Sequence, residues 1–392
     1  MDLESLNTTF AALRPRVEAY ITRDRVRRYL IALSDAPAPS TFAAAMRVPV
    51  LRRLMDADGA LSSDRLTLHG DFGRTGSPVI LMGSAEPTKP LWLFAHLDTI
   101  SYLVQPAAEA RYPLVPFCAH MIRNGRRPAR VYRFDPARNA FGVVGQGQLE
   151  SEDGTPFFRS DDLGPQLRPG DRVVPFTPVR EEESGLFFGQ TDNAGGVAAL
   201  AVAAPVLAEA GIEAVIAFPD EEEGPLGPGN QMIGRGGTRL VNLLPTPDLA
   251  IIADVQQAGG DPEADARGGL ENSTRLGAGA VLAEFSSLGR GAVTPPDLYE
   301  LARHAAGSMG PLGVRVQESN NAYSSRSDDV SVMLKTPNIL LLGFPGFNRH
   351  FDRGEPRVHL DDVVHLAKAL VYMAAVQPLF SARRRAMLER RD

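Results

Sequence analysis

The stretch LWLFAHLD (residues 91–98) is an uncharged apolar run that ends in a histidine and an aspartate. Three other runs have the same design, each of them apolar and followed by polar residues: EAVIAF (213–218), LAII (249–252) and NILLLGF (338–344). Continuous apolar runs of this length are typical of strands that helices cover on both faces. We therefore expect an α/β fold with a mixed, mostly parallel sheet sandwiched by helices.

The residues that follow these runs are of the types that bind metals and transfer protons. His96 and Asp98 follow the first run, and four consecutive acids (220–223) follow the second. Asp254 follows the third run, and His350 follows the fourth. In open α/β sheets, ligands bind beyond the carboxyl ends of the strands. The sequence therefore predicts a functional site at that edge of the sheet.

Helices are expected between the strands. A long run rich in Ala, Val and Leu follows Asp192, which lies where a helix N-cap is expected. The segments 296–310 and 361–380 have the composition and boundary residues of helices. Residues 1–34 also carry apolar residues at helical spacing, and Pro15 is expected to break or kink that helix.

A different pattern occupies the segment from about residue 104 to 187. Its apolar stretches are short and rich in β-branched residues, and Gly, Pro and Asp turns separate them, as in FGVVGQG and RPGDRVVPF. This pattern is typical of a small β domain. We therefore expect a discontinuous catalytic domain made of residues 1–103 and 186–392, with an inserted β-rich domain at 104–185.

Composition narrows the class of protein. The chain has 392 residues, 44% of them hydrophobic and 22% charged, which is ordinary for a globular protein. The net charge of −6 provides no basic surface for nucleic acid or for anionic lipid. The start MDLESLNTTF lacks the apolar core of a signal peptide, and Cys118, the single cysteine, suits a reducing compartment. We expect a cytoplasmic protein that binds neither nucleic acid nor membranes.

Several of the polar residues have an ordinary structural interpretation beside the functional one. The histidine and aspartate of the H-x-D pair could simply be a loop histidine and a surface aspartate. In a metal site, however, Asp98 would accept the second ring proton of His96 and so fix the imidazole tautomer. Asp192 could be only a helix cap, or it could be a carboxylate that bridges two cations. The acids at 220–223 could form a solvated loop, or two of them could divide metal ligation and proton transfer.

The number of candidates favours a two-metal centre. A pair of co-catalytic ions needs about three protein ligands each, with one ligand shared. His96, Asp192 and Asp254 could hold one ion, and Asp192, Glu222 and His350 the other. Imidazole and carboxylate donors favour zinc, with cobalt or manganese possible.

The motifs resemble those of the M42 family of co-catalytic metallo-aminopeptidases, with the M28 peptidases as relatives. LFAHLDTISYLV (93–104) is similar to its strand and H-x-D motif, and GLFFGQTDNAGGVAAL (185–200) to its bridging-aspartate helix. FPDEEEGPLGPG resembles the E-E-x-G-x-x-G loop, which implies Glu221 as the general base and Glu222 as a ligand. LAIIADV resembles the strand before the third ligand, and the block that ends in GFNRHFD implies His350.

This resemblance implies a peptidase that removes N-terminal residues from peptides with two divalent ions, most simply zinc. The nucleophile would be a metal-bridging water, and Glu221 would accept its proton. The resemblance also implies a homo-oligomeric shell assembled through the inserted domain.

Two alternatives remain open. One is an M28- or M20-like metal-dependent deacylase or carboxypeptidase. The other is a catalytically silent relative that acts as an oligomeric scaffold, although all six ligand and base positions are filled. A serine hydrolase is disfavoured because the sequence has no G-x-S-x-G elbow, and the glycine patterns of Rossmann and P-loop enzymes do not follow any expected strand.

Overall fold

The four apolar runs form adjacent parallel strands at the centre of one large sheet. A computed structural model describes residues 3–107, 111–118, 122–160, 166–224, 234–260 and 270–389. The central strands lie in the order β12, β3, β13, β17, and each is parallel to its neighbour. Their bounds are β12 (Ala214–Ala217), β3 (Leu91–Phe94), β13 (Leu249–Ile252) and β17 (Ile339–Phe347). The carboxyl ends of all four strands therefore meet at one edge, as the sequence predicts.

Antiparallel strands extend this sheet on both sides, so that it is mixed. The edge beyond β12 is formed by β2 (Val79–Met82) and β1 (Leu66–His69). On the other side, β17 is followed by the antiparallel strands β18 (Arg357–His359), β11 (Leu186–Phe188) and β10 (Arg180–Glu181). Strand β17 also pairs with β14 (Val255–Gln257), which is parallel to it, and with β15 (Ala280–Ala283), which is antiparallel to it. Strand β16 (Val316–Glu318) pairs with β15 in parallel.

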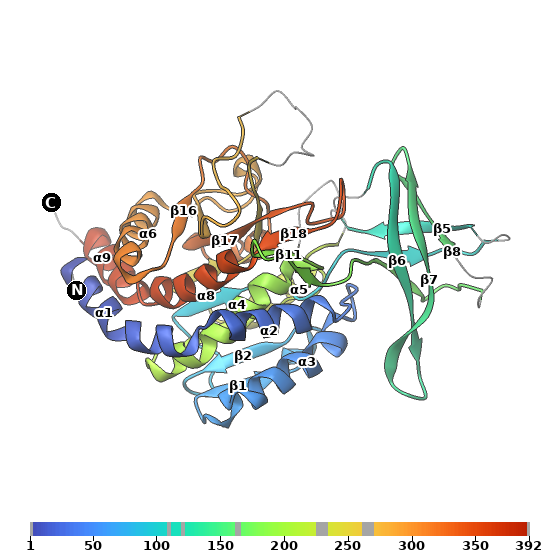
Figure 1. Cartoon of the computed structure of the whole chain (residues 1–392). Coiled ribbons are helices and arrows are strands. Elements are labelled where there is room, and N and C mark those ends of the chain that lie inside the picture. The colour runs from blue at the N-terminus through green and yellow to red at the C-terminus, as the bar shows by residue number, and fades with distance from the viewer. Residues whose placement is uncertain are drawn as a thin grey trace.

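Helices cover both faces of the sheet, which makes the predicted α/β sandwich (Figure 1). Leu93 lies in the larger core, whereas its neighbours Trp92 and Phe94 point to the smaller core on the opposite face. The larger core is built by α1 (Leu3–Tyr20), α2 (Arg23–Ser34), α3 (Ala43–Ala57), α4 (Thr191–Glu209), α6 (Pro296–Met309), α8 (Leu360–Ala374) and α9 (Gln377–Leu388). The smaller core lies under α5 (Arg235–Leu243) and α7 (Asp329–Val332).

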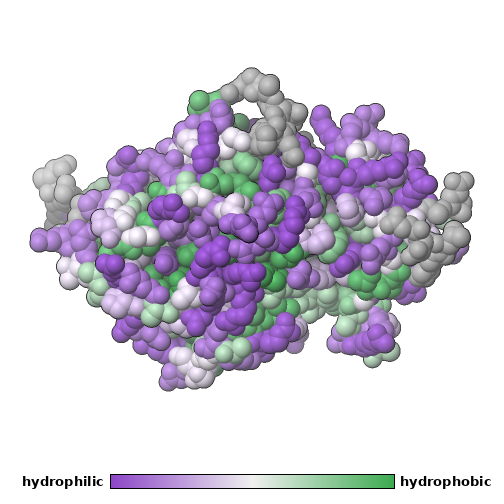
Figure 2. All heavy atoms as spheres, viewed as in Figure 1, coloured by the Kyte–Doolittle hydropathy of each residue, from purple (hydrophilic) through white to green (hydrophobic). Residues whose placement is uncertain are grey.

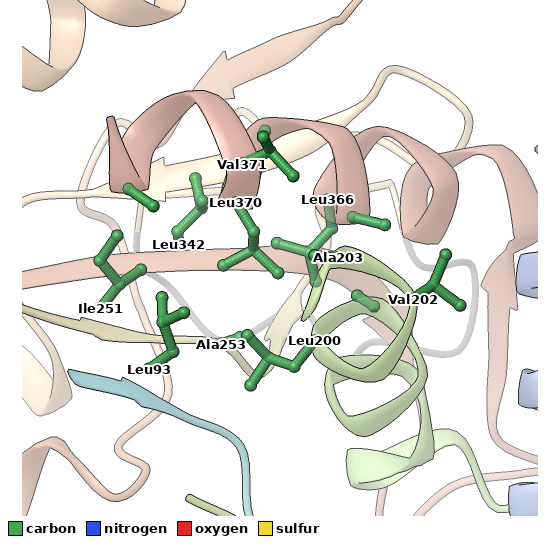
Figure 3. Close-up of a cluster of buried hydrophobic side chains, with 14 of the residues drawn as sticks. Leu93, Leu200, Val202, Ala203, Ile251, Ala253, Leu342, Leu366, Leu370 and Val371 are labelled. Atoms are coloured by element: carbon green, nitrogen blue, oxygen red, sulfur yellow. The ribbon is translucent and has the colours of Figure 1, made fainter. Parts of the chain in front are cut away.

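Helix α4 packs against α8, and both helices contact the sheet. Figure 3 shows Leu200 and Ala203 of α4 and Leu366 and Leu370 of α8 in one cluster with the strand residue Leu93. By length and composition α4 would be able to cross a membrane, but the whole of its apolar window is buried inside the fold. Its apolar character is that of a core helix. Hydrophilic residues cover most of the face shown in Figure 2, with apolar residues visible in small groups between them.

Two helix predictions differ from the structure in detail. Helix α1 runs through Pro15 instead of ending there, because the proline lies on an exposed face where water can satisfy the carbonyl four residues earlier. The segment predicted as one helix at 361–380 contains two helices, α8 and α9. Pro378 lies in the first turn of α9, where its missing N–H is tolerated, and the two helices meet at an angle of 43°.

The inserted β-rich segment folds into a closed barrel. Its strand order is β4 (Ser101–Val104), β5 (Arg111–Phe117), β8 (Thr155–Ser160), β7 (Ala140–Glu152), β6 (Gly125–Asp135) and β9 (Arg172–Pro175). Tyr102, Val131 and Phe158 are buried in its core. The barrel lies at one end of the molecule, and its long β6–β7 hairpin extends beyond the other strands (Figure 1). The exact domain boundaries, predicted at 104–185, stay a prediction.

Candidate metal centre

His96 follows β3 and forms the middle of a buried cluster of carboxylates. Its Nε2 atom lies 3.1 Å from Asp192 Oδ1, 3.6 Å from Asp254 Oδ2 and 3.8 Å from Glu222 Oε2. Asp192 comes from the start of α4, Asp254 from the end of β13 and Glu222 from the loop after β12. The ends of β3 and β13 and the start of α4 thus bring together all three residues predicted for the first ion.

The second imidazole lies on the other side of Asp192. His350 Nε2 is 3.2 Å from Asp192 Oδ2 and 3.0 Å from Glu223 Oε2. Asp192 therefore presents one carboxylate oxygen to each histidine. This is the geometry that a carboxylate shared between two cations requires.

Asp192 does not act as a helix cap. Its two carboxylate oxygens are directed at His96 and His350 instead of at the N–H groups of the first turn of α4. The next residue takes the capping role, because Asn193 Oδ1 accepts a hydrogen bond from Gly196 N at 3.0 Å. Asn193 Nδ2 also donates to the carbonyl of Ala253 at 2.8 Å, beside Asp254. The amide of Asn193 thus fixes the start of α4 against the end of β13.

The acidic loop differs from the expectation by one residue. Glu221, expected as the general base, points away from the histidines and pairs with Arg239, at 2.5 Å between Oε1 and Nη2. Glu222, expected as a metal ligand, faces His96, and Glu223 occupies the place beside His350. The reason is a left-handed backbone at Glu221, with φ +62°, which turns the following two residues inward.

Asp98 connects the loop after β3 with the acidic loop. Its carboxylate accepts hydrogen bonds from the N–H groups of Glu222 at 3.0 Å and Glu223 at 3.3 Å, and from Ser40 Oγ at 2.6 Å. The contact with the second ring nitrogen of His96 differs from the predicted one. His96 Nδ1 lies 3.1 Å from the carbonyl oxygen of Asp98 and 3.5 Å from its carboxylate.

Sequence reasoning missed several charged residues that surround the cluster. Arg326 Nη1 lies 3.5 Å from Glu222 Oε1, and Arg349 Nη1 lies 3.5 Å from Asp192 Oδ2. Arg47 is fully buried in α3 and donates to the carbonyl of Leu97 at 2.6 Å. Burial lowers the pKa of Arg47 to about 10, although nearby carboxylates oppose this. Of these arginines, Arg349 is the one that lies next to a predicted ligand in the sequence, directly before His350.

Burial and the neighbouring charges shift the pKa values of groups in the cluster. Desolvation raises the pKa of Glu222 to about 8, and the carboxylates of Glu223 and Asp254 add to this against the opposing charges of Arg326 and His96. Burial would lower the pKa of His350, but Glu223 and Asp192 outweigh it and raise the value to about 9. This cluster of buried acids therefore favours positive charge in its midst.

The donor atoms fit a divalent cation. Ligand atoms of His96, Asp192 and Glu223 all lie within 4.8 Å of one another. Among the described residues, Asp254 Oδ2 and Glu223 Oε1 are buried without a hydrogen-bond partner, although buried carboxylate oxygens are normally satisfied. Imidazole and carboxylate together suit zinc and its neighbours among the first-row metals.

Comparison with known sequences decides the family. The profile of peptidase family M20/M25/M40 matches residues 165–375, which is more than half of the chain. The chain belongs to this family. It is therefore a hydrolase of a peptidase family, for which divalent metal cofactors are implied. The resemblance to a peptidase family, stated from the sequence, is confirmed. No curated protein matches the chain.

Solved structures of low sequence identity share the fold of this M20/M25/M40 family member. An aminopeptidase from the archaeon Desulfurococcus kamchatkensis has a TM-score of 0.69 at 16% identity, over 92% of this chain and 98% of its own. A TET aminopeptidase from a marine sediment archaeon of the Thaumarchaeota gives 0.68 at 16% identity, over 91% and 99%. The Pyrococcus horikoshii TET1 peptidase, described as able to assemble into a tetrahedron or a large octahedral shell, gives 0.67 at 17% identity, over 89% and 99%.

Proposed function

We propose that the protein is an aminopeptidase that uses two divalent metal ions, most simply zinc, with cobalt or manganese as alternatives. The observation that carries this proposal is the position of Asp192, with one carboxylate oxygen 3.1 Å from His96 and the other 3.2 Å from His350. The fold shared with aminopeptidases and the peptidase family of the chain support it. Its substrates would be peptides with a free N-terminus.

Each residue of the cluster has a role in this proposal. His96, Asp192 and Asp254 would hold one ion, and Asp192, Glu223 and His350 the other. The bound ions supply Lewis acidity, which polarises the scissile carbonyl and activates a water molecule. Glu222 replaces Glu221 as the general base, because its carboxylate faces His96 from within the cluster. It would take the proton of the attacking water and pass it to the leaving amine. Asp98 orients His96 and the two glutamates through the contacts described above.

The test joins metal analysis to substrate profiling. Purified protein should contain about two equivalents of zinc, cobalt or manganese, as the count of ligand sets requires. It should release p-nitroaniline from aminoacyl-p-nitroanilides and leave the N-acetylated compounds intact. A protein that cleaves only the acetylated compounds, or that binds no metal, would contradict the proposal.

A carboxypeptidase or deacylase is the second candidate, and the two arginines favour it. The Arg326 side chain is only 9% exposed beside Glu222, and that of Arg349 is 13% exposed beside Asp192. Guanidinium groups at a reaction centre are suited to a substrate carboxylate. Preferential cleavage of N-acyl amino acids with a free C-terminal carboxylate would establish this alternative. A catalytically silent scaffold is less favoured, because both histidines and all the proposed carboxylates are present.

We also propose that the chain forms a homo-oligomer through its barrel and acts in the cytoplasm. The TET1 peptidase of the same fold forms large shells, which supports the first point. The buried free thiol of Cys118 suits the second. Size-exclusion chromatography with light scattering distinguishes a monomer of 42.2 kDa from an assembly.

A further inference from the structure

The acidic loop contains one glutamate that the proposed reaction does not use. Glu221 Oε1 lies 2.5 Å from Arg239 Nη2, and its Oε2 lies 3.7 Å from Arg235 Nη1. Both arginines belong to α5, on the sheet face opposite α4. Arg239 is itself fixed, because its Nε donates to the carbonyl of Thr75 at 2.8 Å. The side chain of Glu221 is thus tied to a helix outside the metal centre.

The backbone at Glu221 turns the loop. Its φ of +62° lies in the left-handed region, which a residue with a side chain adopts at a steric cost. On one side of this turn, the carboxylate of Asp220 accepts hydrogen bonds from Thr41 N at 3.0 Å and Ala43 N at 3.2 Å. On the other side, the N–H groups of Glu222 and Glu223 donate to Asp98. Relaxation of the turn would move the two glutamates off Asp98.

The ion pair is too exposed to serve mainly as a source of global stability. The side chains of Arg239 and Arg235 are 41% and 39% exposed, although that of Glu221 is 13% exposed, and pairs with a solvent-exposed partner contribute little to the free energy of unfolding. Its more direct effect is to hold one rotamer and one backbone conformation at a single residue. A contact of this kind suits the positioning of neighbouring groups, because small displacements at a reaction centre are costly to the rate.

We infer that Glu221 and Arg239 form a clamp that holds the left-handed turn and so keeps Glu222 and Glu223 directed into the metal centre. Glu221 is therefore a positioning residue and does not touch the substrate. The consequence for the rate rests on the proposed function, in which Glu222 is the general base. The consequence for the conformation of the loop does not.

The conformational test is hydrogen–deuterium exchange on the metal-free protein, read from peptides that contain residues 218–224. The variants are Glu221→Gln, Arg239→Met and the double variant. Local opening should become easier in all three, and the amides of Glu222 and Glu223 should exchange about tenfold faster. The double variant should show less than the sum of the two single effects, because both substitutions weaken the contact between Glu221 and Arg239. Arg303→Met is the control, since Arg303 is 43% exposed and pairs with Glu318 at 2.9 Å far from this loop.

The kinetic test uses the metal-loaded enzyme and its best peptide substrate. At saturating metal, each clamp variant should lower kcat by about tenfold or more with KM unchanged, because the proposed base Glu222 is displaced while substrate binding is untouched. Metal should also bind more weakly, because the same turn directs the proposed ligand Glu223. Unchanged exchange rates in both single variants would overturn the clamp, whatever the activity. Faster exchange with unchanged kcat would overturn its role in positioning the base. A wild-type protein that cleaves no peptide would refute the proposed function, and exchange alone would then decide the clamp.

Discussion

His350 Nε2 lies 3.0 Å from Glu223 Oε2, and Glu222 lies on the other side of the centre, 3.8 Å from His96 Nε2. Two consecutive glutamates therefore face two different histidines. One loop can therefore supply a ligand to one ion and a proton acceptor beside the other. This relationship sets the roles that mutagenesis can separate.

The first prediction concerns these adjacent glutamates. Glu223→Gln should lose about one equivalent of metal, because it removes a charged ligand beside His350. Glu222→Gln should keep both metal ions and lower kcat by about 10²- to 10⁴-fold, as the loss of a general base does. Elemental analysis and steady-state kinetics on the same preparations measure both quantities. Retention of full metal by Glu223→Gln together with loss of metal by Glu222→Gln would reverse the two roles.

The second prediction concerns the effect of metal on stability. A ligand that binds only the folded state stabilises it by about 2.7 kcal/mol at a hundredfold excess over its Kd. Zinc should therefore raise the unfolding midpoint of the chelator-treated protein, and chelator should reverse the rise. Asp192→Asn should lose most of this response, because Asp192 contacts both histidines. Asp297→Asn, at a surface pair with Arg384, is the control that should keep it.

The third prediction concerns the start of α4. Asn193→Ala should lower the free energy of unfolding by about 1–3 kcal/mol, because it leaves the Gly196 N–H and the Ala253 carbonyl without their side-chain partner in a buried place. Urea unfolding of the metal-free protein measures this loss. Asn7→Ala, on the exposed face of α1, should change stability by no more than about 0.5 kcal/mol. Equal effects of the two substitutions would contradict the capping role of Asn193.

The fourth prediction concerns pH. Burial and the neighbouring Arg315 and Lys368 lower the pKa of His365 from 6.5 to about 4. Between these values the unfolded chain binds more protons at this residue than the folded protein does. The contribution of His365 to stability is thus complete above pH 6.5 and is lost as the pH falls through about 4.

The variant His365→Gln removes this dependence. Its unfolding midpoint in urea should fall less than that of the wild type between pH 7 and pH 4.5, because the other titrating groups are common to both proteins. The test is the difference between the two stability curves, each measured across that range. Parallel curves would show that the imidazole has no depressed pKa.

The core of the site was predictable because its geometry follows from strand direction. Continuous apolar runs mark strands that are buried on both faces, and the carboxyl ends of parallel strands meet at one edge of the sheet. His96, Asp254 and His350 follow such strands, so their meeting required no knowledge of the loops. The assignment of the α/β sheet is confirmed for the same reason.

The roles within the acidic loop were not predictable in this way. Any two adjacent residues of the three consecutive glutamates could serve as base and ligand. The spacing to Gly224 favoured Glu221 as the base and Glu222 as the ligand. Which glutamate faces which histidine depends on the left-handed turn at Glu221 and on two partners that are distant in the sequence, Arg239 and Asp98. The cationic side chains of Arg326 and Arg349 likewise reach the centre only through the folded loops.

The sequence by itself thus determined the sheet, its direction and the edge at which the metal-binding residue types gather, because local hydrophobic pattern and strand polarity are properties of short segments. The tertiary structure alone decided which glutamate faces which histidine and which arginines surround them. Those contacts depend on one backbone torsion angle and on residues from separate helices and loops, which no local pattern encodes.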